Sequence, residues 1–338
     1  MTANTKGDRG RYANEPLVSI VLLAYNGKRY LDDCALSIAR QDYHNIEIVV
    51  VNNGSTDGSV QTLRDTYPQW NYVVHENNLG FSAGMNSGLA SARGDYLVFL
   101  NQDVYLDESF VSCGVRILES LPDAGALGAL EYKWADGERT EHLRSTGPAL
   151  FLRLRIQGVW LMTDSPVSRC FGVNGSFPLL RREALAELER LDGHCFDPAF
   201  FSGWEDQDLW WRMQLRGWSC YATQKTKAWH VGSGSAGEKE SFLSKSPRYQ
   251  RSILRNRWFV ILKNIPLPLL IFVSPLLLTL EIGLPFYLLL RSPGTLASWV
   301  GGWQDVARSL GSIRAKRAAI QDTRKLPLRV VVRWFKGF

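Results

Sequence analysis

The apolar run at residues 96–100, Tyr-Leu-Val-Phe-Leu, ends abruptly in the polar residues Asn101, Gln102 and Asp103. A strand that is apolar on both faces belongs in the middle of a mostly parallel sheet, because both of its faces are covered. Open α/β sheets bind ligands at the carboxyl ends of their strands, so Asp103 is expected at the edge where such folds do chemistry. A carboxylate there suits a divalent cation that also contacts phosphate oxygens. It equally suits an ordinary loop aspartate exposed to solvent.

Predicted strands and helices alternate on the amino-terminal side of this run. Apolar, β-branched stretches indicate strands, and segments with apolar residues every three or four positions indicate helices. The expected strands cover residues 17–24, 46–51 and 72–74, and the expected helices cover residues 31–38, 59–66 and 83–92. Such alternation is typical of βαβ units joined by right-handed crossovers. We therefore predict an α/β fold with a mostly parallel central sheet flanked by helices.

The middle of the chain departs from this rhythm. Residues 130–170 are rich in Trp, Arg and Gly, and we interpret them as an inserted region of the same domain. A helical pattern returns at Arg181, and residues 196–218 are dense in aromatic and acidic side chains. The segment at 232–237 matches G-x-G-x-x-G, but no strand-turn-helix unit surrounds it. We therefore predict a mobile loop there and not a dinucleotide site.

The cysteines and the charge distribution limit the class of protein. Five cysteines are scattered without C-x-x-C spacing, which disfavours a disulfide framework or a zinc site and fits a reducing cytosol. Residues 1–14 are polar and carry both charge signs, which predicts a loose tail and not a signal peptide. Residues 248–338 contain fifteen Lys/Arg and three Asp/Glu, a net charge of +12, which leaves −6 for residues 1–247. Because the basic part is also the most hydrophobic, it favours an anionic membrane surface over nucleic acid.

Further polar loops follow other predicted strands. They are Tyr25 and Asn26 after the first strand, Asn52, Asn53 and Asp57 after the second, and Gly80 and Asn86 at a glycine-bearing helix entry. These residue types are common in turns and helix caps, which would explain them structurally. At the carboxyl edge of a sheet, however, amide side chains can pair with a nucleobase. Backbone N–H groups at a helix entry can also approach a phosphate.

Taken together and in order, these segments resemble the family 2 glycosyltransferases, nucleotide-sugar-dependent enzymes with the GT-A fold, and in particular their rhamnosyltransferase-like branch. The resemblance covers residues 17–235, about two thirds of the chain. Each motif alone is weak, whereas the ordered set is specific. The motifs are Ser19-Ile20-Val21 with Tyr25-Asn26, Asn53-Gly54-Ser55-Thr56-Asp57-Gly58-Ser59, Asn78-Leu79-Gly80-Phe81, Leu100-Asn101-Gln102-Asp103, Arg181-Arg182-Glu183, Phe196-Asp197 with Phe200-Phe201, Glu205-Asp206-Gln207-Asp208-Leu209, and His230.

The resemblance implies a donor site and a metal site. Asp103 corresponds to the last acid of the family's D-x-D-type motif and would bind, with His230, a divalent metal (Mg²⁺ or Mn²⁺) that bridges the donor diphosphate. Asn101 replaces the first Asp and would be a weak ligand or a hydrogen-bond donor to the sugar. Many members have Asp where this chain has Asn52 or Asn53, and an amide can still accept the N–H of uracil or thymine. The implied donor-binding residues are Tyr25, Asn26, Asn52, Asn53, Asp57, Gly80, Asn86, Asn101 and Gln102.

A second acidic cluster lies at residues 205–208, at a predicted helix start where the helix dipole alone favours acids. The resemblance implies that Asp206 is the general base that removes the acceptor hydroxyl proton, with Glu205 supporting it. Attack from the face opposite the nucleotide would invert the anomeric centre. Trp204 could stack on an acceptor sugar. Asp208 is a weaker acceptor-binding candidate that equally suits bonding to neighbouring structure.

The apolar stretch at residues 265–290 indicates a membrane-associating region. Prolines interrupt it, Glu281 lies inside it, and the charge-free piece at residues 264–280 is shorter than the ~20 residues that cross a bilayer. We expect helices that lie on an anionic membrane surface or insert shallowly into it. A spanning helix, a soluble helical cap and a homodimer contact stay open.

The leading hypothesis is an inverting, metal-dependent glycosyltransferase on the inner, cytoplasmic face of the cell membrane. It would move one sugar from dTDP-rhamnose or a UDP-sugar to a hydroxyl of a lipid-linked or cell-surface glycan. Two alternatives are a non-catalytic nucleotide-sugar-binding scaffold and a processive polysaccharide synthase subunit, although the Q-x-x-R-W motif of such synthases is missing. The expected parts are a flexible tail at 1–15, a catalytic domain at 16–245 with a nucleotide-sugar half (16–105) and an acceptor half (106–245), and a basic, apolar helical region at 246–338.

Overall fold

The computed structural model describes residues 15–135, 137–145, 147–151, 156–159, 165–232 and 242–336. The predicted N-terminal tail at 1–14 and the glycine-serine loop from residue 233 onward lie outside the described residues. Every structural statement below concerns the described part of the chain.

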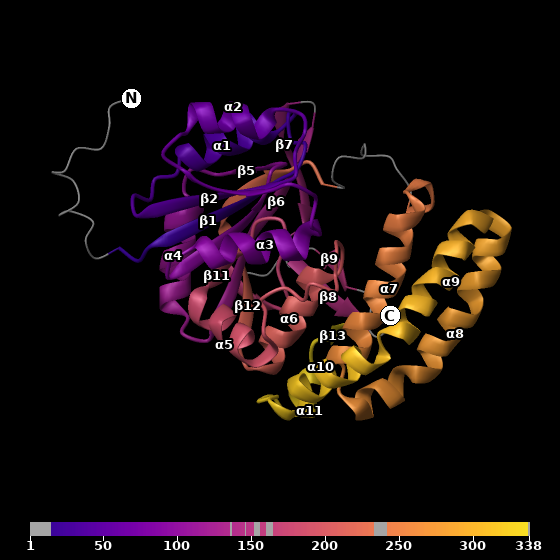
Figure 1. The fold of residues 1–338 in the computed structure, drawn as a ribbon. Helices are drawn as coiled ribbons and strands as arrows, with labels where there is room; N and C mark the ends of the chain where they lie inside the picture. The colour runs from indigo at the N-terminus through magenta and orange to yellow at the C-terminus, as the bar shows by residue number, and fades with distance from the viewer. Residues whose placement is uncertain are drawn as a thin grey trace.

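The amino-terminal half has the expected alternation of strands and helices (Figure 1). Four strands pair in parallel in the order β4-β1-β2-β3, and the helices between them cover the two faces of the sheet. The strands are β1 (Val18–Ala24), β2 (Ile46–Asn53), β3 (Asn71–His75) and β4 (Tyr96–Asn101); the helices are α1 (Leu31–Ala39), α2 (Ser59–Thr66) and α3 (Gly80–Ser91). Because the strands are parallel, their carboxyl ends meet at one edge.

The second half extends this sheet in mixed orientation. β11 lies antiparallel between β4 and β6, β6 pairs in parallel with β12, and β12 also holds β5 and β10 in antiparallel pairs. The strands are β5 (Val104–Leu106), β6 (Ala124–Ala135), β7 (Glu138–Ser145), β10 (Val167–Cys170), β11 (Leu179–Arg181) and β12 (Ser219–His230); the helices are α4 (Phe110–Ser120), α5 (Arg182–Asp192) and α6 (Glu205–Leu215). β7 extends this sheet by pairing with β6, so the inserted region contributes a strand to it.

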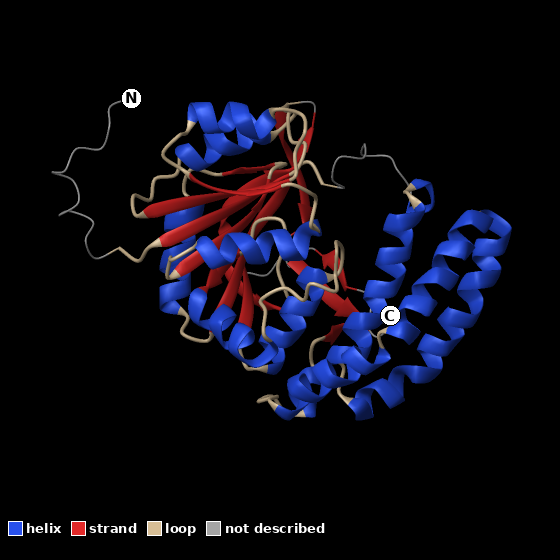
Figure 2. Cartoon of the chain, in the orientation of Figure 1, coloured by secondary structure: helices blue, strands red, loops and turns tan. Residues whose placement is uncertain are grey.

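Helices cover both faces of the sheet (Figure 2), and each face has its own hydrophobic core, so the strands are apolar on both faces. Alternate residues of β1 divide between the two: Ile20 and Leu22 pack with residues of α1 and α4, whereas Val21 packs with residues of α3 and α5. Burying one large aliphatic side chain contributes about 1.5–3 kcal/mol to the stability of the fold, so this packing on both faces is the main stabilisation of the sheet. The prediction of a sheet covered on both faces is confirmed.

The C-terminal region is helical and packs against the helices that cover the central sheet (Figure 1). Its helices are the 3-10 turn Phe242–Ser244, α7 (Pro247–Asn264), α8 (Leu267–Arg291), α9 (Pro293–Arg308), α10 (Leu310–Asp322) and α11 (Leu328–Val332). α7 contacts α6, and α10 contacts α5. The last strand, β13 (Phe335–Lys336), pairs with β8 (Gly147–Phe151), which also pairs with β9 (Ile156–Val159). The end of the chain thus returns to the inserted region.

α8 lies at the outer edge of the molecule, away from the central sheet (Figure 1). It has 25 residues and, among the described helices, is the one that is long and apolar enough by length and composition to cross a membrane. Two prolines, Pro275 and Pro285, lie inside it. Most of its large apolar side chains face outward, including Phe272, Phe286 and Leu290, which are 73%, 66% and 83% exposed.

We predict that two identical substitutions in helices will have opposite effects on stability. A Cβ at Gly88 of α3 would lie 2.4 Å from Val21 Cγ1 and 2.7 Å from Val51 Cγ2, inside the core. Gly88→Ala should therefore lower the free energy of unfolding by about 1–3 kcal/mol. A Cβ at Gly311 of α10 meets nothing within 4 Å, so Gly311→Ala should raise it by about 0.5–1 kcal/mol. Urea unfolding measures both, and a neutral Gly88→Ala would contradict the close packing of α3 on the sheet.

Candidate active site

A cleft of about 1520 Å³ opens at the carboxyl edge of the sheet. It is bounded by the ends of β1 and β4, the end of β12, the turn that precedes α6, and the first turn of α7. Of the residues predicted from the sequence, it is lined by Tyr25, Asn26, Asn101, Gln102, Asp103, Trp204, Glu205, Asp206 and His230. Two acidic motifs that are far apart in the chain therefore share one cavity.

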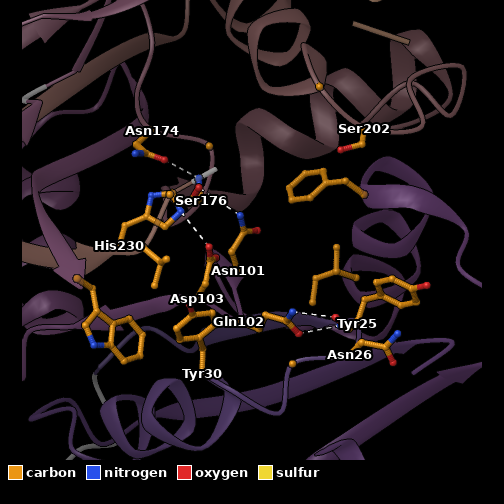
Figure 3. A pocket seen from close by; sticks show the side chains of 18 of the residues that line it. Tyr25, Asn26, Tyr30, Asn101, Gln102, Asp103, Asn174, Ser176, Ser202 and His230 are labelled. Carbon is orange, nitrogen blue, oxygen red and sulfur yellow. Dashed lines mark hydrogen bonds and ion pairs between the residues drawn. The ribbon is translucent and has the colours of Figure 1, made fainter. Parts of the chain in front are cut away.

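Asp103 and His230 face each other in this cleft (Figure 3). Asp103 follows β4 and Gln102, and the antiparallel pairing of β5 with β12 puts His230 opposite Val104. His230 Nε2 lies 3.5 Å from Asp103 Oδ2, and His230 Nδ1 lies 2.9 Å from Glu131 Oε1. Burial opposes charge on the imidazole, but the two carboxylates outweigh it and raise the pKa of His230 to about 9. Burial likewise opposes ionisation of Asp103, but the hydrogen bond from His230 keeps the pKa of Asp103 below its usual value.

The chemistry of this pair fits a divalent cation. In the neutral tautomer with its proton on Nδ1, His230 donates an Nδ1–H hydrogen bond to Glu131, and its Nε2 lone pair points toward Asp103. Carboxylate–histidine pairs orient metal ligands in this way. Two ligand atoms ~2.1 Å from one ion and roughly 90–110° apart are separated by about 3.0–3.5 Å, as Nε2 and Oδ2 are here. No group of three or more His, Cys, Asp or Glu side chains in the described residues is arranged to hold a metal.

Glu205 and Asp206 form the second acidic pair, at the first turn of α6. Asp206 Oδ1 accepts a hydrogen bond of 2.7 Å from the Gln207 backbone N–H, and Glu205 Oε2 has no hydrogen-bond partner among the described residues. Burial raises the pKa of Asp206 to about 6. Burial and then the charge of Asp206 raise the pKa of Glu205 to about 8. Burial therefore disfavours the charged form of both carboxyl groups, and the charge of Asp206 further opposes ionisation of Glu205, which raises the pKa of each.

Trp204, the residue before this pair, has a left-handed backbone with φ of 72°. A bulky side chain rarely adopts this conformation, and such strain persists only where the surroundings enforce it. Gly203, with φ of 86°, shares the turn, and the Asp208 N–H donates to the Trp204 carbonyl at 3.0 Å to begin the helix. The turn directs Trp204, Glu205 and Asp206 to the cleft.

Four residues predicted to bind the donor also line the cleft: Tyr25, Asn26, Asn101 and Gln102 (Figure 3). The Gln102 amide exchanges two 2.8 Å hydrogen bonds with the Tyr25 backbone, which fixes the loop after β1. Asn26 Oδ1 accepts the Thr56 N–H at 2.8 Å and so joins the loops after β1 and β2. Asn101 Nδ2 donates to Ser176 Oγ at 3.2 Å. The Tyr25 side chain is 43% exposed and available to a ligand.

Other predicted donor residues do not line this cleft, because their polar groups bind the protein itself. Asn53 is buried and bonds to Asn78 Oδ1, the Gly80 carbonyl and the Leu79 N–H. Asn86 exchanges two hydrogen bonds with the Phe196 backbone, at 2.7 and 3.0 Å. Gly80 has φ of 82°, and a Cβ there would lie 2.3 Å from the Phe201 carbonyl oxygen. These three residues contact the protein itself, and their direct contact with the donor stays a prediction.

The remaining predicted residues also have protein partners. Asn52 Oδ1 accepts the Ser55 N–H at 2.9 Å, and Asn52 lines a separate cavity of about 250 Å³ with Arg64 and Tyr72. Asp57 caps α2 through Ser59 and accepts the Lys28 N–H at 3.0 Å.

Asp208 is wholly buried. Its carboxylate is paired with Arg212 Nε at 2.9 Å and with Lys263 Nζ at 3.0 Å. Of the two interpretations of Asp208, its placement supports bonding to neighbouring structure over acceptor binding.

Several cleft residues were not predicted from the sequence. Asn174, Gly175 and Ser176 form a turn in which Asn174 Oδ1 accepts the Ser176 N–H at 2.8 Å (Figure 3). A Cβ at Gly175 would lie 2.7 Å from Asp206 Cβ, so a larger residue would displace the acid. Glu131, and Tyr249 at the start of α7, were also missed. The Asn-Gly-Ser sequence at 174–176 is a local signal for a turn at the cleft. Glu131 and Tyr249 have no such signal, because their positions depend on contacts between segments far apart in the chain.

The cleft at the strand ends, with an acid–imidazole pair and a second buried acid pair, defines an α/β enzyme. The family model described as glycosyl transferase family 2 matches residues 19–188, half of the chain, and the chain belongs to this family. The sequence motifs predicted this family.

Curated relatives agree with this family. The chain is 34% identical over 119 residues to an uncharacterized glycosyltransferase of Haemophilus influenzae, which covers 34% of this chain and 37% of that protein. It is 28% identical over 192 residues to the glycosyltransferase GlyG of Streptococcus pneumoniae, which covers 54% of this chain and 62% of that protein. The matches thus span about a third to three fifths of the length of these two relatives.

Solved structures share the fold. GalNAc-T7 with UDP, GalNAc and Mn²⁺ aligns with a TM-score of 0.59 at 16% identity and covers 73% of this chain and 48% of that chain. S. aureus TarS aligns with a TM-score of 0.57 at 16% identity, covering 91% and 52%. The mannosyltransferase PcManGT from Pyrobaculum calidifontis, in complex with GDP-Man and Mn²⁺, gives 0.52 at 17% identity, covering 91% and 86%. The chain has the GT-A fold.

We predict that Asn53 stabilises the fold and that its neighbour Asn52 contributes little. Asn53→Ala removes three hydrogen bonds of a buried side chain, among them the partner of the Leu79 N–H, so the free energy of unfolding should fall by about 2–4 kcal/mol. Asn52→Ala, the matched control, removes one half-exposed hydrogen bond and should cost under about 1 kcal/mol. Urea unfolding compares the two. If both variants lose equally little stability and Asn53→Ala binds the donor more weakly, Asn53 contacts the donor and does not mainly stabilise the fold.

Proposed function

We propose that this protein is an inverting, metal-dependent glycosyltransferase that moves one sugar from a nucleoside-diphosphate donor to a hydroxyl of a glycan acceptor. The observation that carries this proposal is the presence of two acidic groups of different chemistry in one cleft. One is the Asp103–His230 pair, suited to a cation, and the other is the Glu205–Asp206 pair, suited to proton transfer.

Asp103 and His230 would hold Mg²⁺ or Mn²⁺, which would neutralise the donor diphosphate as its charge grows during departure. GalNAc-T7 and PcManGT were both solved with Mn²⁺, which supports the same ion class here. Because Asn101 replaces the first acid of the motif, Asp103 is the one carboxylate of that motif and the metal should depend on it strongly. Glu131 fixes the His230 ring and so sets the direction of Nε2.

Asp206 would act as the base for the acceptor hydroxyl. Its raised pKa makes it a better proton acceptor than an ordinary carboxylate while it still ionises at neutral pH. Glu205, protonated at neutral pH, would keep the pair from carrying two charges. The Trp204 ring beside the pair would stack on an acceptor sugar. One-step displacement of the nucleotide by the deprotonated hydroxyl inverts the anomeric carbon.

We infer a pyrimidine donor, dTDP-rhamnose or a UDP-sugar. The Asn26 amide after β1 lines the cleft, where its Nδ2 can donate to a pyrimidine carbonyl; GalNAc-T7 was solved with UDP, whereas PcManGT was solved with GDP-Man. A thermal-shift screen of nucleotides and nucleotide sugars with Mn²⁺ tests this. A larger shift with dTDP or UDP compounds than with GDP or ADP compounds supports the inference, and a purine preference overturns it.

The acceptor would be carried at the cytoplasmic face of the cell membrane, as a lipid-linked or cell-surface glycan. The large apolar side chains exposed on α8 are Leu267, Ile271, Phe272, Leu278, Leu280, Ile282, Phe286, Tyr287, Leu289 and Leu290, with no Asp, Glu, Lys or Arg among them. A helix of 25 residues is about 37 Å long, so this surface is large for a monomeric protein. The region that carries it has a net charge of +12, which attracts anionic lipid.

α8 would lie in one leaflet and not span the bilayer. Its acid, Glu281, turns inward and binds Arg257 of α7 at 2.6 Å and the indole N–H of Trp299 of α9 at 3.2 Å. α7 and α9 are themselves joined by the ion pair of Arg251 with Asp305. A spanning α8 would draw these charged helices into the hydrocarbon, which is costly.

We predict that the two acidic sites fail in different ways. Asp206→Asn should lower kcat by about 10²–10⁴-fold, since it removes the base, and should leave Mn²⁺-dependent donor affinity intact. Asp103→Ala should abolish the Mn²⁺-dependent part of donor affinity. Both are measured by nucleoside-diphosphate release and donor titration. Turnover at the native rate in folded Asp206→Asn would overturn the proposed base, and Mn²⁺-dependent binding in Asp103→Ala would overturn the metal site.

We predict an acid limb in the pH–rate profile near the raised pKa of Asp206, about 6. The reaction needs ionised Asp206, so kcat should be level above pH 7 and fall tenfold per pH unit well below 6. An ordinary aspartate would place this limb near pH 4. Donor affinity measured over the same pH range controls for loss of the metal. Full activity at pH 5 would contradict the assignment.

We predict that α8 binds anionic vesicles. Phe272→Asp combined with Phe286→Asp should weaken cosedimentation with phosphatidylglycerol–phosphatidylcholine vesicles at least tenfold, because both rings are exposed on the apolar face. Val74→Asp is the matched control, since Val74 is 57% exposed on β3. If the double variant binds vesicles normally, or instead converts a dimer into a monomer in light scattering, the apolar face is not a lipid-binding surface.

A further inference from the structure

Helix α7 buries three polar side chains that point toward the catalytic domain. Asn256 and Asn264 are 0% exposed and Lys263 is 1% exposed. Lys263 and Asn264 follow Asn256 by seven and eight positions, about two helical turns, so the three side chains lie on one side of α7. Buried polar groups are costly unless they are paired, so their partners show what the face binds. All of the partners of these side chains outside α7 lie between Asp197 and Asp208, close to the proposed base in the chain.

Asn256 holds the strained turn before the base. Its Nδ2 donates to the Gly203 carbonyl at 2.7 Å and to the Ser202 carbonyl at 3.2 Å. These are the two residues directly before Trp204, whose left-handed conformation directs α6. Arg255 donates to Asn256 Oδ1 at 2.8 and 2.9 Å, which fixes the amide with its donor group toward the turn.

Lys263 joins the two sides of the same segment. Its Nζ lies 2.6 Å from Asp197 Oδ2 and 3.0 Å from Asp208 Oδ1. Asp197 begins the loop that leads to the turn, where its carboxylate also accepts the Ala199 N–H at 3.0 Å, and Asp208 is on the first turn of α6. Asn264 adds a second hydrogen bond to Asp208 Oδ1, at 2.8 Å. The segment that carries the base is therefore held at both ends by one helix face.

Each of these carboxylates has another cation partner besides Lys263. Asp197 lies 2.6 Å from Lys316 Nζ of α10, and Asp208 lies 2.9 Å from Arg212 Nε. An uncharged residue at position 263 would therefore leave neither carboxylate without a positive neighbour. What it would remove is the link between the loop and the helix. This makes Lys263 suitable for substitution without loss of the fold.

We propose that Asn256 and Lys263 are positioning residues for the transfer reaction, which set the location of the Glu205–Asp206 pair from outside the cleft. This inference rests on the proposed role of Asp206 as the base. The C-terminal helices are then part of the catalytic machinery and not only a means of reaching the membrane. Misplacement of a catalytic group by about 1 Å can cost on the order of 10²-fold in rate, so two hydrogen bonds to the turn are enough to matter.

The experiment compares Asn256→Leu and Lys263→Met with Arg251→Met. Arg251 also lies on α7, but its partner is Asp305 of α9 and not the catalytic segment. Release of nucleoside diphosphate from UDP-glucose and dTDP-rhamnose with Mn²⁺ is measured per folded protein, with the folded fraction taken from circular dichroism. We expect kcat to fall at least tenfold in Asn256→Leu and in Lys263→Met, with KM for the donor within about twofold of native. Arg251→Met should match the native enzyme.

Asp206→Asn, assayed beside them, separates this inference from the proposed function. If Asp206→Asn is inactive while both α7 variants keep the native kcat per folded protein, the positioning role is overturned and the base assignment stands. If Asp206→Asn is fully active, the base assignment fails and the positioning role fails with it. A rise in KM for the donor with unchanged kcat would also overturn the inference, because the face would then serve donor binding.

Discussion

The pairing of β5 with β12 is the contact on which the cleft depends. β12 comes late in the chain, yet its register against β5 and β6 places His230 beside Asp103 and Glu131. A one-residue slip would reverse which side chains face the cleft, since side chains alternate along a strand. The same strand supports β10 and closes the sheet beyond β6. The metal site, the cleft wall and the second half of the sheet therefore share one set of backbone hydrogen bonds.

The C-terminal helices contribute to two surfaces at once. The inner face of α7 binds the segment that carries Asp206, and Arg257 on the same helix binds Glu281 of α8. α8 in turn presents the apolar face that we assign to lipid. If the acceptor is carried by the membrane as proposed, the proposed base must lie at a defined distance from it. A helix that contacts both the base segment and the lipid-facing helix provides such a spacing without a flexible linker.

Sequence patterns predicted the parts of the molecule whose structure is local. The helix at 59–66 and the strands around it follow from periodicity, and the apolar run at 96–100 correctly marks the centre of the sheet. The sequence did not indicate whether a polar side chain at a strand end hydrogen-bonds to the protein or lines the cleft. Asn53 and Asn26 both follow strands, but Asn53 turns inward and Asn26 lines the cleft, and tertiary packing decides which. Glu131 and Asn256 were missed because their partners lie far away in the chain.

The central claim is that Asp103 and His230 hold a cation that binds the donor diphosphate. Anomalous diffraction from crystals grown with Mn²⁺ and UDP tests it most directly. The account predicts a manganese peak ~2.0–2.3 Å from an Asp103 carboxylate oxygen and from His230 Nε2, in contact with both phosphates of UDP. Ordered UDP in the cleft with no manganese peak at this pair, or with manganese bound by other residues, would contradict it.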